Sequence, residues 1–185
     1  MTVPRLTALG DGRWAADAPD AAAMRALGQV LAGSLRAGDL VVLDGPLGAG
    51  KTTFVQGLAA GLGVRGAVTS PTFVIARRHP GPRVALVHVD AYRVGSALEI
   101  DDLDLDADIA DSVTVVEWGI DKVEGLGDSC LVVTIDRPFG AEGSGSAQSE
   151  DGDPDEEADP AAGPRHVVVQ GIGARWAAGL HLGKR

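Results

Sequence analysis

The stretch DLVVLDGPLGAGKTTFVQGLAAGLG, residues 39–63, predicts a buried strand, a glycine-rich turn and a helix in succession. Asp39–Gly45 contains the unbroken apolar run Leu40–Leu43, made of Val and Leu, which is typical of a strand covered on both faces. Thr52–Gly63 carries apolar residues at helical spacing and ends in glycine, which predicts a helix. Between them, Gly45–Thr52 matches the eight-residue phosphate-loop pattern GxxxxGK[ST].

Each part of this loop suits the binding of a phosphate chain. Glycine amides can wrap the phosphates, and the N-terminus of the following helix adds positive potential. Lys51 is predicted to reach the terminal phosphates and Thr52 to ligate magnesium. Pro46 lacks an amide proton, but it stands at the entry of the loop, before the cradling positions. The plainer alternative is a glycine-rich strand-to-helix turn with an exposed lysine, and the full motif in its matching context disfavours it.

A phosphate loop also needs an acidic side chain near the magnesium. Asp90 ends the apolar run RVALVHVD and Glu117 ends VTVVE, so both are predicted at the carboxyl edge of the sheet, where ligands collect in α/β folds. One would orient magnesium and the other the attacking water, in an order that the sequence leaves open. The alternative for each is an acid that only caps a turn. His88 is interpreted as a structural histidine away from the face of Asp90, with a catalytic base as the alternative.

Thr69-Ser70-Pro71-Thr72 follows the predicted helix, where many phosphate-loop proteins carry a hydroxyl that senses the γ-phosphate. Ser70 or Thr72 is predicted in that role, with a plain Ser-Pro turn as the alternative.

The rest of the chain predicts one α/β domain over residues 1–185. A helix is predicted over Pro19–Arg36, after an opening segment with no predicted element, and short helical turns over Val94–Asp111. Further strands are predicted over Phe73–Arg78, Arg83–Asp90, Val113–Trp118, Cys130–Asp136 and His166–Gly171. Residues 140–164 combine Gly, Ser, Ala, Pro and acids, which predicts a disordered acidic loop between two paired strands.

The net charge of −10 belongs mostly to that one segment. Its eight acids leave a formal charge of −2 on the rest of the chain, which gives neither a basic footprint for nucleic acid nor a general acidic surface. The single cysteine, Cys130, and the absence of a long apolar run at the start predict a cytoplasmic protein without a membrane span.

The sequence favours ATP over GTP as the nucleotide, bound with Mg²⁺. GTPases of this loop class usually select guanine with an Asn/Thr-Lys-x-Asp segment, and the chain contains no asparagine. A small-molecule P-loop kinase is an alternative, but it needs an arginine-bearing lid, and the late insertion is acidic. A nucleotide-dependent binding module is a second alternative.

With these motifs in place, the sequence resembles the TsaE (YjeE) family of small ATPases in bacterial tRNA threonylcarbamoyladenosine biosynthesis. The matching motifs, in order, are Leu47–Phe54, Ser70-Pro71-Thr72, His88-Val89-Asp90-Ala91-Tyr92-Arg93 and Glu117-Trp118. The chain departs from many members at Pro46, at Gly119 and in its acidic insertion.

The resemblance implies a P-loop NTPase-like three-layer fold with a mixed central sheet, and ATP hydrolysis that resets a tRNA-modifying complex. Slow hydrolysis by the isolated chain is predicted because the sequence shows no clear arginine finger. TsaD-type threonylcarbamoyl-transferase and TsaB-type companion proteins are the implied partners, with tRNA contacted only through them. It also places Trp14 and the start of the first helix near the adenine. The predicted catalytic residues are Lys51, Asp90 and Glu117, and the predicted magnesium ligands are Thr52, Asp90 and Glu117. The predicted nucleotide-binding residues are Leu47, Gly48, Ala49, Gly50, Lys51, Thr52, Thr53, Ser70 and Thr72.

Overall fold

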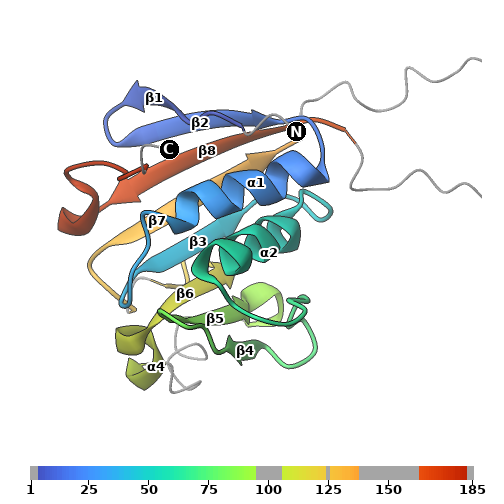
Figure 1. Ribbon diagram of the computed structural model, residues 1–185, viewed down its shortest axis with the longest axis vertical. Helices are drawn as coiled ribbons and strands as arrows, with labels where there is room; N and C mark the ends of the chain where they lie inside the picture. Colours follow the sequence, from blue (N-terminus) through green and yellow to red (C-terminus); the bar gives the residue numbers. More distant parts are fainter. Residues whose placement is uncertain (1–3, 95–105, 124–125, 138–162, 183–185) are drawn as a thin grey trace, which may run out of the picture.

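One mixed eight-stranded sheet organises the protein, whose computed structural model describes residues 4–94, 106–123, 126–137 and 163–182. The strands lie in the order β1-β2-β8-β7-β3-β6-β5-β4 (Figure 1). The four central strands β7, β3, β6 and β5 are parallel, and the pairs outside them are antiparallel. The strand bounds are β1 Thr7–Gly10, β2 Arg13–Ala18, β3 Leu40–Asp44, β4 Ala76–His79, β5 Ala85–Asp90, β6 Ser112–Glu117, β7 Cys130–Asp136 and β8 Arg165–Ile172.

Two helices, α1 (Ala21–Ala32) and α2 (Lys51–Leu62), cover one face of the sheet and pack against each other (Figure 1). Their backbones approach closely at glycines: a Cβ added to Gly57 would lie 2.1 Å from the carbonyl oxygen of Arg25. Asp20 caps α1 by accepting a hydrogen bond from the amide of Ala23 at 2.7 Å. The main core lies between these helices and the sheet, around Leu27, Phe54 and neighbouring apolar side chains.

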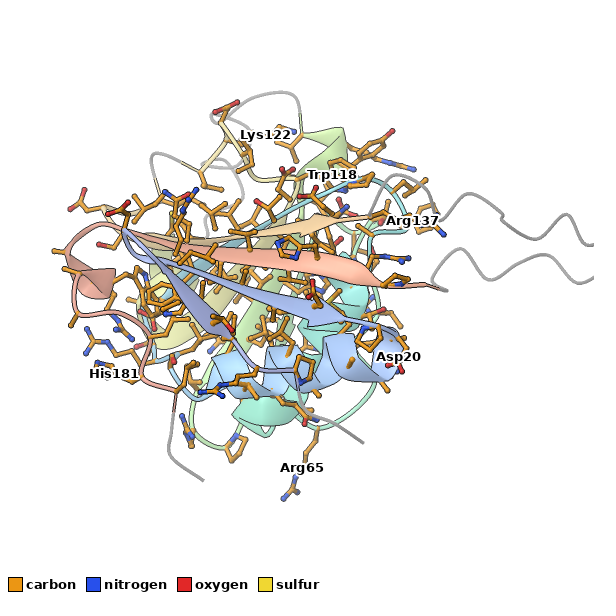
Figure 2. All side chains as sticks on the ribbon, turned by 90° about the horizontal axis from the view of Figure 1, so that it is seen from above. Asp20, Arg65, Trp118, Lys122, Arg137 and His181 are labelled. Atoms are coloured by element: carbon orange, nitrogen blue, oxygen red, sulfur yellow. The ribbon has the colours of Figure 1, made fainter. Side chains whose placement is uncertain are left out.

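The opposite face of the sheet carries a second, smaller core around Val42, Val89 and Val116. It is covered by the helical turn η1 (Ala91–Arg93), the short helix α4 (Asp106–Asp111) and the segment that follows β6. Figure 2 shows this side, where Lys122 lies, across the sheet from α1 and α2. The predicted three-layer α/β fold with a mixed sheet is therefore confirmed, and its third layer is built of short elements.

The elements differ from the predicted ones in three places. β1 and β2 form in the opening segment, where no element was predicted, because β2 pairs with β8 along its whole length. α1 ends at Ala32, four residues before Arg36. The strand predicted over Phe73–Arg78 begins only at Ala76, because Ile75 adopts the left-handed backbone at φ +65°.

The antiparallel pairing of β7 with β8 confirms that two late strands are partners. The acidic loop predicted between them, residues 140–164, lies almost wholly outside the described residues, as does much of the segment predicted to hold short helical turns, of which α4 is described. Within the described part of the chain, none of the helices is long and apolar enough to cross a membrane.

Candidate functional site

The phosphate-loop motif joins β3 to α2 in the predicted arrangement. Gly48 and Gly50 adopt φ of +74° and +101°, a conformation that glycine takes without strain. Gly50 is the N-cap of α2, and no side chain caps that helix. The amides of its first turn therefore face the loop without an intrahelical partner, which makes the loop an anion-binding site in form.

Lys51 points back into the loop. Its ammonium donates to the carbonyl oxygens of Gly45 at 2.6 Å and Pro46 at 3.0 Å, and lies 3.7 Å from the ring centroid of Trp118. Burial lowers the pKa of the Lys51 ammonium, and the nearby carboxylates, Glu117 foremost, oppose that change. The loop thus holds a buried positive charge near three carboxylates, those of Glu117, Asp44 and Asp90.

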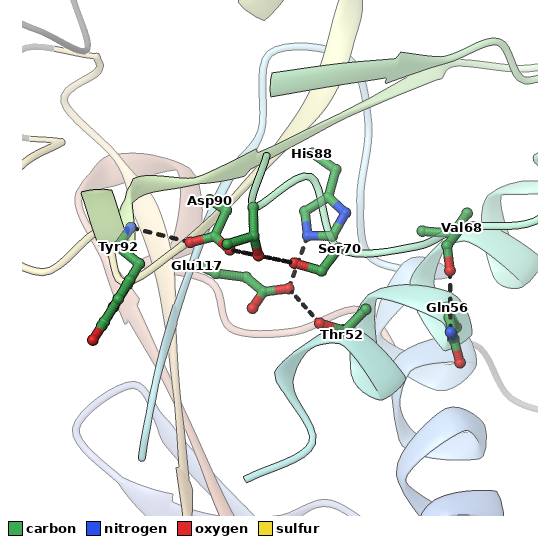
Figure 3. A network of polar contacts seen from close by, with 9 residues as sticks. Thr52, Gln56, Val68, Ser70, His88, Asp90, Tyr92 and Glu117 are labelled. Atoms are coloured by element: carbon green, nitrogen blue, oxygen red, sulfur yellow. Dashed lines mark hydrogen bonds and ion pairs between the residues drawn. The ribbon is translucent and has the colours of Figure 1, made fainter. Parts of the chain in front are cut away.

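Asp90 and Glu117 stand at the carboxyl ends of the neighbouring parallel strands β5 and β6, directly opposite each other in register. Both are buried, at 5% and 4% exposure. Their side chains nevertheless belong to separate hydrogen-bond networks, one reaching the helix α2 and the other reaching the Ser-Pro-Thr segment (Figure 3). The structure therefore gives the two acids different neighbours, a distinction that the sequence did not contain.

Glu117 is linked to the start of α2. Its Oε1 accepts a hydrogen bond from the Thr52 hydroxyl at 2.9 Å and lies 2.9 Å from Nε2 of His88. His88 was interpreted as lying off the face of Asp90, and that interpretation is wrong. The two residues are two positions apart on β5, so their side chains share one face of the sheet, the face that α2 covers.

Asp90 is linked instead to the segment between α2 and β4. Its Oδ2 accepts from the hydroxyls of Thr72 at 2.5 Å and Ser70 at 3.3 Å, and its Oδ1 accepts from the amide of Tyr92 at 3.0 Å. The amides of Val74 and Ile75 bond to the carbonyl of Pro71, and this turn carries Thr72 to the carboxylate. Both hydroxyls predicted as sensors are thus brought to the site.

A cleft of about 380 Å³ opens where these parts meet. All of the predicted site residues line it, with Leu47 almost fully exposed at the rim. The complete lining consists of Leu47, Gly48, Ala49, Gly50, Lys51, Thr52, Thr53, Ser70, Thr72, Asp90, Glu117 and Trp118.

The donor set fits a magnesium ion. The Thr52 hydroxyl and the carboxylates of Asp90 and Glu117 offer hard oxygen ligands at one cleft. The described residues form no group of three or more His, Cys, Asp or Glu that would enclose a metal by themselves. A magnesium ion held by one or two carboxylates and completed by phosphate and water does not need such a group.

Three contacts at the site were not predicted from the sequence, because each joins residues that are distant from one another along the chain. Arg165, at the start of β8, donates to the carbonyls of Ala49 at 3.2 Å and Gly48 at 3.3 Å and so braces the phosphate loop. Lys122 donates to the carbonyls of Ala91 and Val94 and ties the segment after Glu117 to the turn after Asp90. The bond from His88 to Glu117 is the third.

The region expected near the adenine is only partly at the site. The start of α1 lies beside the loop, where Asp20, Ala21 and Met24 share a small pocket with Gly50 and Arg165. Trp14 packs elsewhere, with its ring next to Gly179 in the C-terminal segment, and it is not among the residues that line either pocket.

Fold and site together define the class of the chain: it is a P-loop α/β protein, with its phosphate loop, lysine and strand-end acids at one cleft. Comparison with known proteins narrows this class. A family profile described as "Threonylcarbamoyl adenosine biosynthesis protein TsaE" matches residues 18–140. The chain belongs to the TsaE family.

Individual relatives agree with this assignment. A Streptomyces coelicolor protein named tRNA threonylcarbamoyladenosine biosynthesis protein TsaE is 55% identical over 157 residues, covering 83% of this chain and 94% of the relative. A Mycobacterium tuberculosis protein of the same name is 50% identical over 121 residues, 60% of this chain and 71% of the relative. The crystal structure of Bacillus subtilis YdiB superposes with a TM-score of 0.62 at 26% identity, covering 94% of this chain and 90% of that chain.

Proposed function

We propose that this protein is a magnesium-dependent ATPase that supports repeated rounds of tRNA threonylcarbamoyladenosine formation. One observation carries the proposal: the uncapped N-terminus of α2, Lys51 and the paired acids Asp90 and Glu117 line a single cleft. This is the arrangement that phosphoryl transfer from a nucleoside triphosphate needs, since it depends on positioning and on neutralising charge. Membership in the TsaE family supplies the pathway.

Within this proposal the parts of the cleft have distinct tasks. The amides of the phosphate loop and Lys51 would hold the phosphate chain, and Thr52 with the two acids would hold Mg²⁺, which when bound neutralises phosphate charge. Glu117 is already bonded to Thr52, so it is the acid tied to the metal-binding hydroxyl. Asp90 is bonded to Ser70 and Thr72, so it is the acid that would report the state of the phosphates to the Ser-Pro-Thr segment.

The absence of asparagine from the chain supports ATP as the nucleotide, because it rules out the commonest guanine-selecting segment. We further propose that the partners are a TsaD-type transferase and a TsaB-type companion, that tRNA is reached only through them, and that the protein acts in the cytoplasm. We expect slow hydrolysis by the isolated chain and faster hydrolysis in the presence of the partners.

The decisive experiment is a reconstituted modification of tRNA followed over several turnovers by mass spectrometry of the nucleosides. Three samples are compared: the wild-type protein, the Lys51→Ala variant and no added protein. We expect a yield of threonylcarbamoyladenosine beyond one round only with the wild type, because Lys51→Ala removes the charge that faces the terminal phosphates. Equal yields in all three samples would contradict the proposed role.

Two other functions give different results in companion assays. A small-molecule P-loop kinase would transfer the γ-phosphate of labelled ATP to a metabolite, whereas an ATPase releases inorganic phosphate. A nucleotide-dependent binding module would keep its biological output in the Asp90→Ala and Glu117→Ala variants, even though both changes remove hydrolysis.

A further inference from the structure

His88 is buried in the sheet with one ring nitrogen engaged and the other alone. The side chain has 0% exposure in the middle of β5. Its Nε2 lies 2.9 Å from Oε1 of Glu117 (Figure 3), while Nδ1 has no hydrogen-bond partner among the described residues. An apolar side chain would fill this position without leaving a buried polar atom unpaired, so packing alone does not account for a histidine here.

These contacts fix where the ring proton must lie. Oε1 of Glu117 also accepts the Thr52 hydroxyl, so it acts as a hydrogen-bond acceptor toward both neighbours. The ring must then donate from Nε2. A proton on Nδ1 would be a buried hydrogen-bond donor without an acceptor. Leaving an unprotonated Nδ1 without a partner costs less free energy than leaving such a donor unpaired.

The bond from His88 settles which oxygen of Glu117 faces the cleft. Both described hydrogen bonds of this carboxylate end on Oε1, one from His88 and one from Thr52. Oε2 is left for the cleft that Glu117 lines. Without the histidine, the carboxylate would be held by the Thr52 hydroxyl alone and could rotate about its last bond.

We infer that His88 is a positioning residue, which donates from Nε2 to Oε1 of Glu117 and thereby keeps Oε2 directed at the reacting groups in the cleft. This rests on the proposed ATPase function. It parallels the way in which a second layer of hydrogen bonds orients the ligands at metal sites. It also means that His88 is not a proton acceptor in the reaction, because its one free nitrogen faces the protein interior.

The first test measures which ring nitrogen of His88 carries the proton. The ¹⁵N NMR spectrum of histidine-labelled full-length protein contains signals from four histidines, and the His88→Gln spectrum identifies those of His88 by their disappearance. We expect a protonated Nε2 and an unprotonated Nδ1 for His88 in the free protein. A protonated Nδ1 would overturn the inference, whatever the protein does with ATP.

The second test separates positioning from packing. His88→Leu removes the donor, while His88→Gln offers an amide N–H near the place of Nε2. We expect His88→Leu to lower kcat about 10- to 100-fold, the range for lost second-layer contacts, with the Kd for a fluorescent ADP analogue unchanged. The Gln variant should recover most of kcat. Equal loss in both variants, or an unchanged kcat in His88→Leu, would refute positioning.

His79 provides the matched control. It is a second buried histidine with an unpartnered ring nitrogen, on β4 next to β5. Burial, with His88 and Arg77 nearby, lowers the pKa of His79, but no hydrogen bond among the described residues joins it to Glu117. His79→Leu should alter the melting temperature without lowering kcat. If it lowers kcat as His88→Leu does, the loss comes from disturbing the sheet and the inference fails.

The proposed ATPase function and the positioning role of His88 can be refuted separately. If the wild-type protein binds nucleotide but releases no phosphate, the proposed function is wrong, and the NMR spectrum still decides the protonation of His88. If the wild type hydrolyses ATP and His88→Leu does not fold, the inference is decided by the His88→Gln rate and the ring signals. A His88→Gln rate far below wild type would then count against it.

Discussion

The close approach of α1 and α2 gives a sharp test of the packing that sets the position of the phosphate loop. At Gly57 an added Cβ would lie 2.1 Å from the carbonyl oxygen of Arg25 and 2.8 Å from its carbonyl carbon. Both contacts are with backbone, so no flexible side chain can move aside. Gly57→Ala therefore forces the two helices apart or bends one of them.

The size of the effect follows from two opposing terms. Overpacking of a well-packed core costs about 1–3 kcal/mol, and a clash with backbone belongs at the upper end of that range. Replacing glycine by alanine inside a helix returns about 1 kcal/mol. We therefore expect Gly57→Ala to lower the free energy of unfolding by about 2 kcal/mol, which for a chain of 150–250 residues is a fall in Tm of about 4–8 °C.

Urea unfolding followed by circular dichroism, together with a thermal melt, measures this loss. Gly33→Ala is the matched control, because Gly33 is the C-cap of α1 with an ordinary helical φ of −63° and its added Cβ would meet only the carbonyl of Val30, at 3.3 Å. The control should be as stable as the wild type or slightly more so. A Gly57→Ala protein that unfolds at the wild-type urea concentration would show that the helix contact is not rigid.

Three further predictions concern the cleft and the late strands. Arg165→Met removes the hydrogen bonds to the carbonyls of Gly48 and Ala49. We expect the affinity for ADP, measured by fluorescence titration, to fall about tenfold if one charged hydrogen bond of roughly 1.5 kcal/mol is lost. An unchanged affinity would mean that the loop keeps its shape without Arg165. Trp118→Ala removes a ring that competes with phosphate for the Lys51 ammonium. Because a cation–π contact contributes about 0.5–2 kcal/mol, we expect calorimetry to show nucleotide affinity raised about 2- to 30-fold. A fall in affinity would show that the indole helps to bind nucleotide. Deleting residues 140–162, whose composition offers little apolar surface, should leave the melting temperature and ADP affinity at wild-type values, and a large loss of thermal stability would refute the predicted disorder of that segment.

The local elements around the phosphate loop were predictable from the sequence because their causes are local. An unbroken Val and Leu run bounded by turn residues is typical of a strand covered on both faces, and β3 lies in the middle of the sheet, between β6 and β7. Gly48 and Gly50 stand where the backbone needs a positive φ. The same logic predicted Asp90 and Glu117 at one edge, since parallel strands end together.

The secondary structure of two segments depends on hydrogen-bond partners that are distant in sequence, so it could not be predicted locally. β2 reads RWAADA, which has few β-branched residues, and it becomes a strand because β8 offers it a complete ladder of hydrogen bonds. Phe73–Ile75 has the composition of a strand but forms a turn that brings Thr72 to Asp90. In both segments the available hydrogen-bond partners outweighed local propensity.

The finer arrangement of the cleft was also outside the reach of the sequence alone. The contacts of His88 with Glu117, of Thr52 with Glu117 and of Arg165 with the phosphate loop join residues that lie 29, 65 and 116 or more positions apart. Spacing along a chain does not specify such pairs, because they arise only when the sheet has placed β5, β6 and β8 around α2. A phosphate loop and two strand-end acids could be predicted from the order of residues alone. The folded sheet sets the contacts of Glu117 with Thr52 and of Asp90 with Ser70 and Thr72, because each acid bonds to the hydroxyl that packing brings within reach.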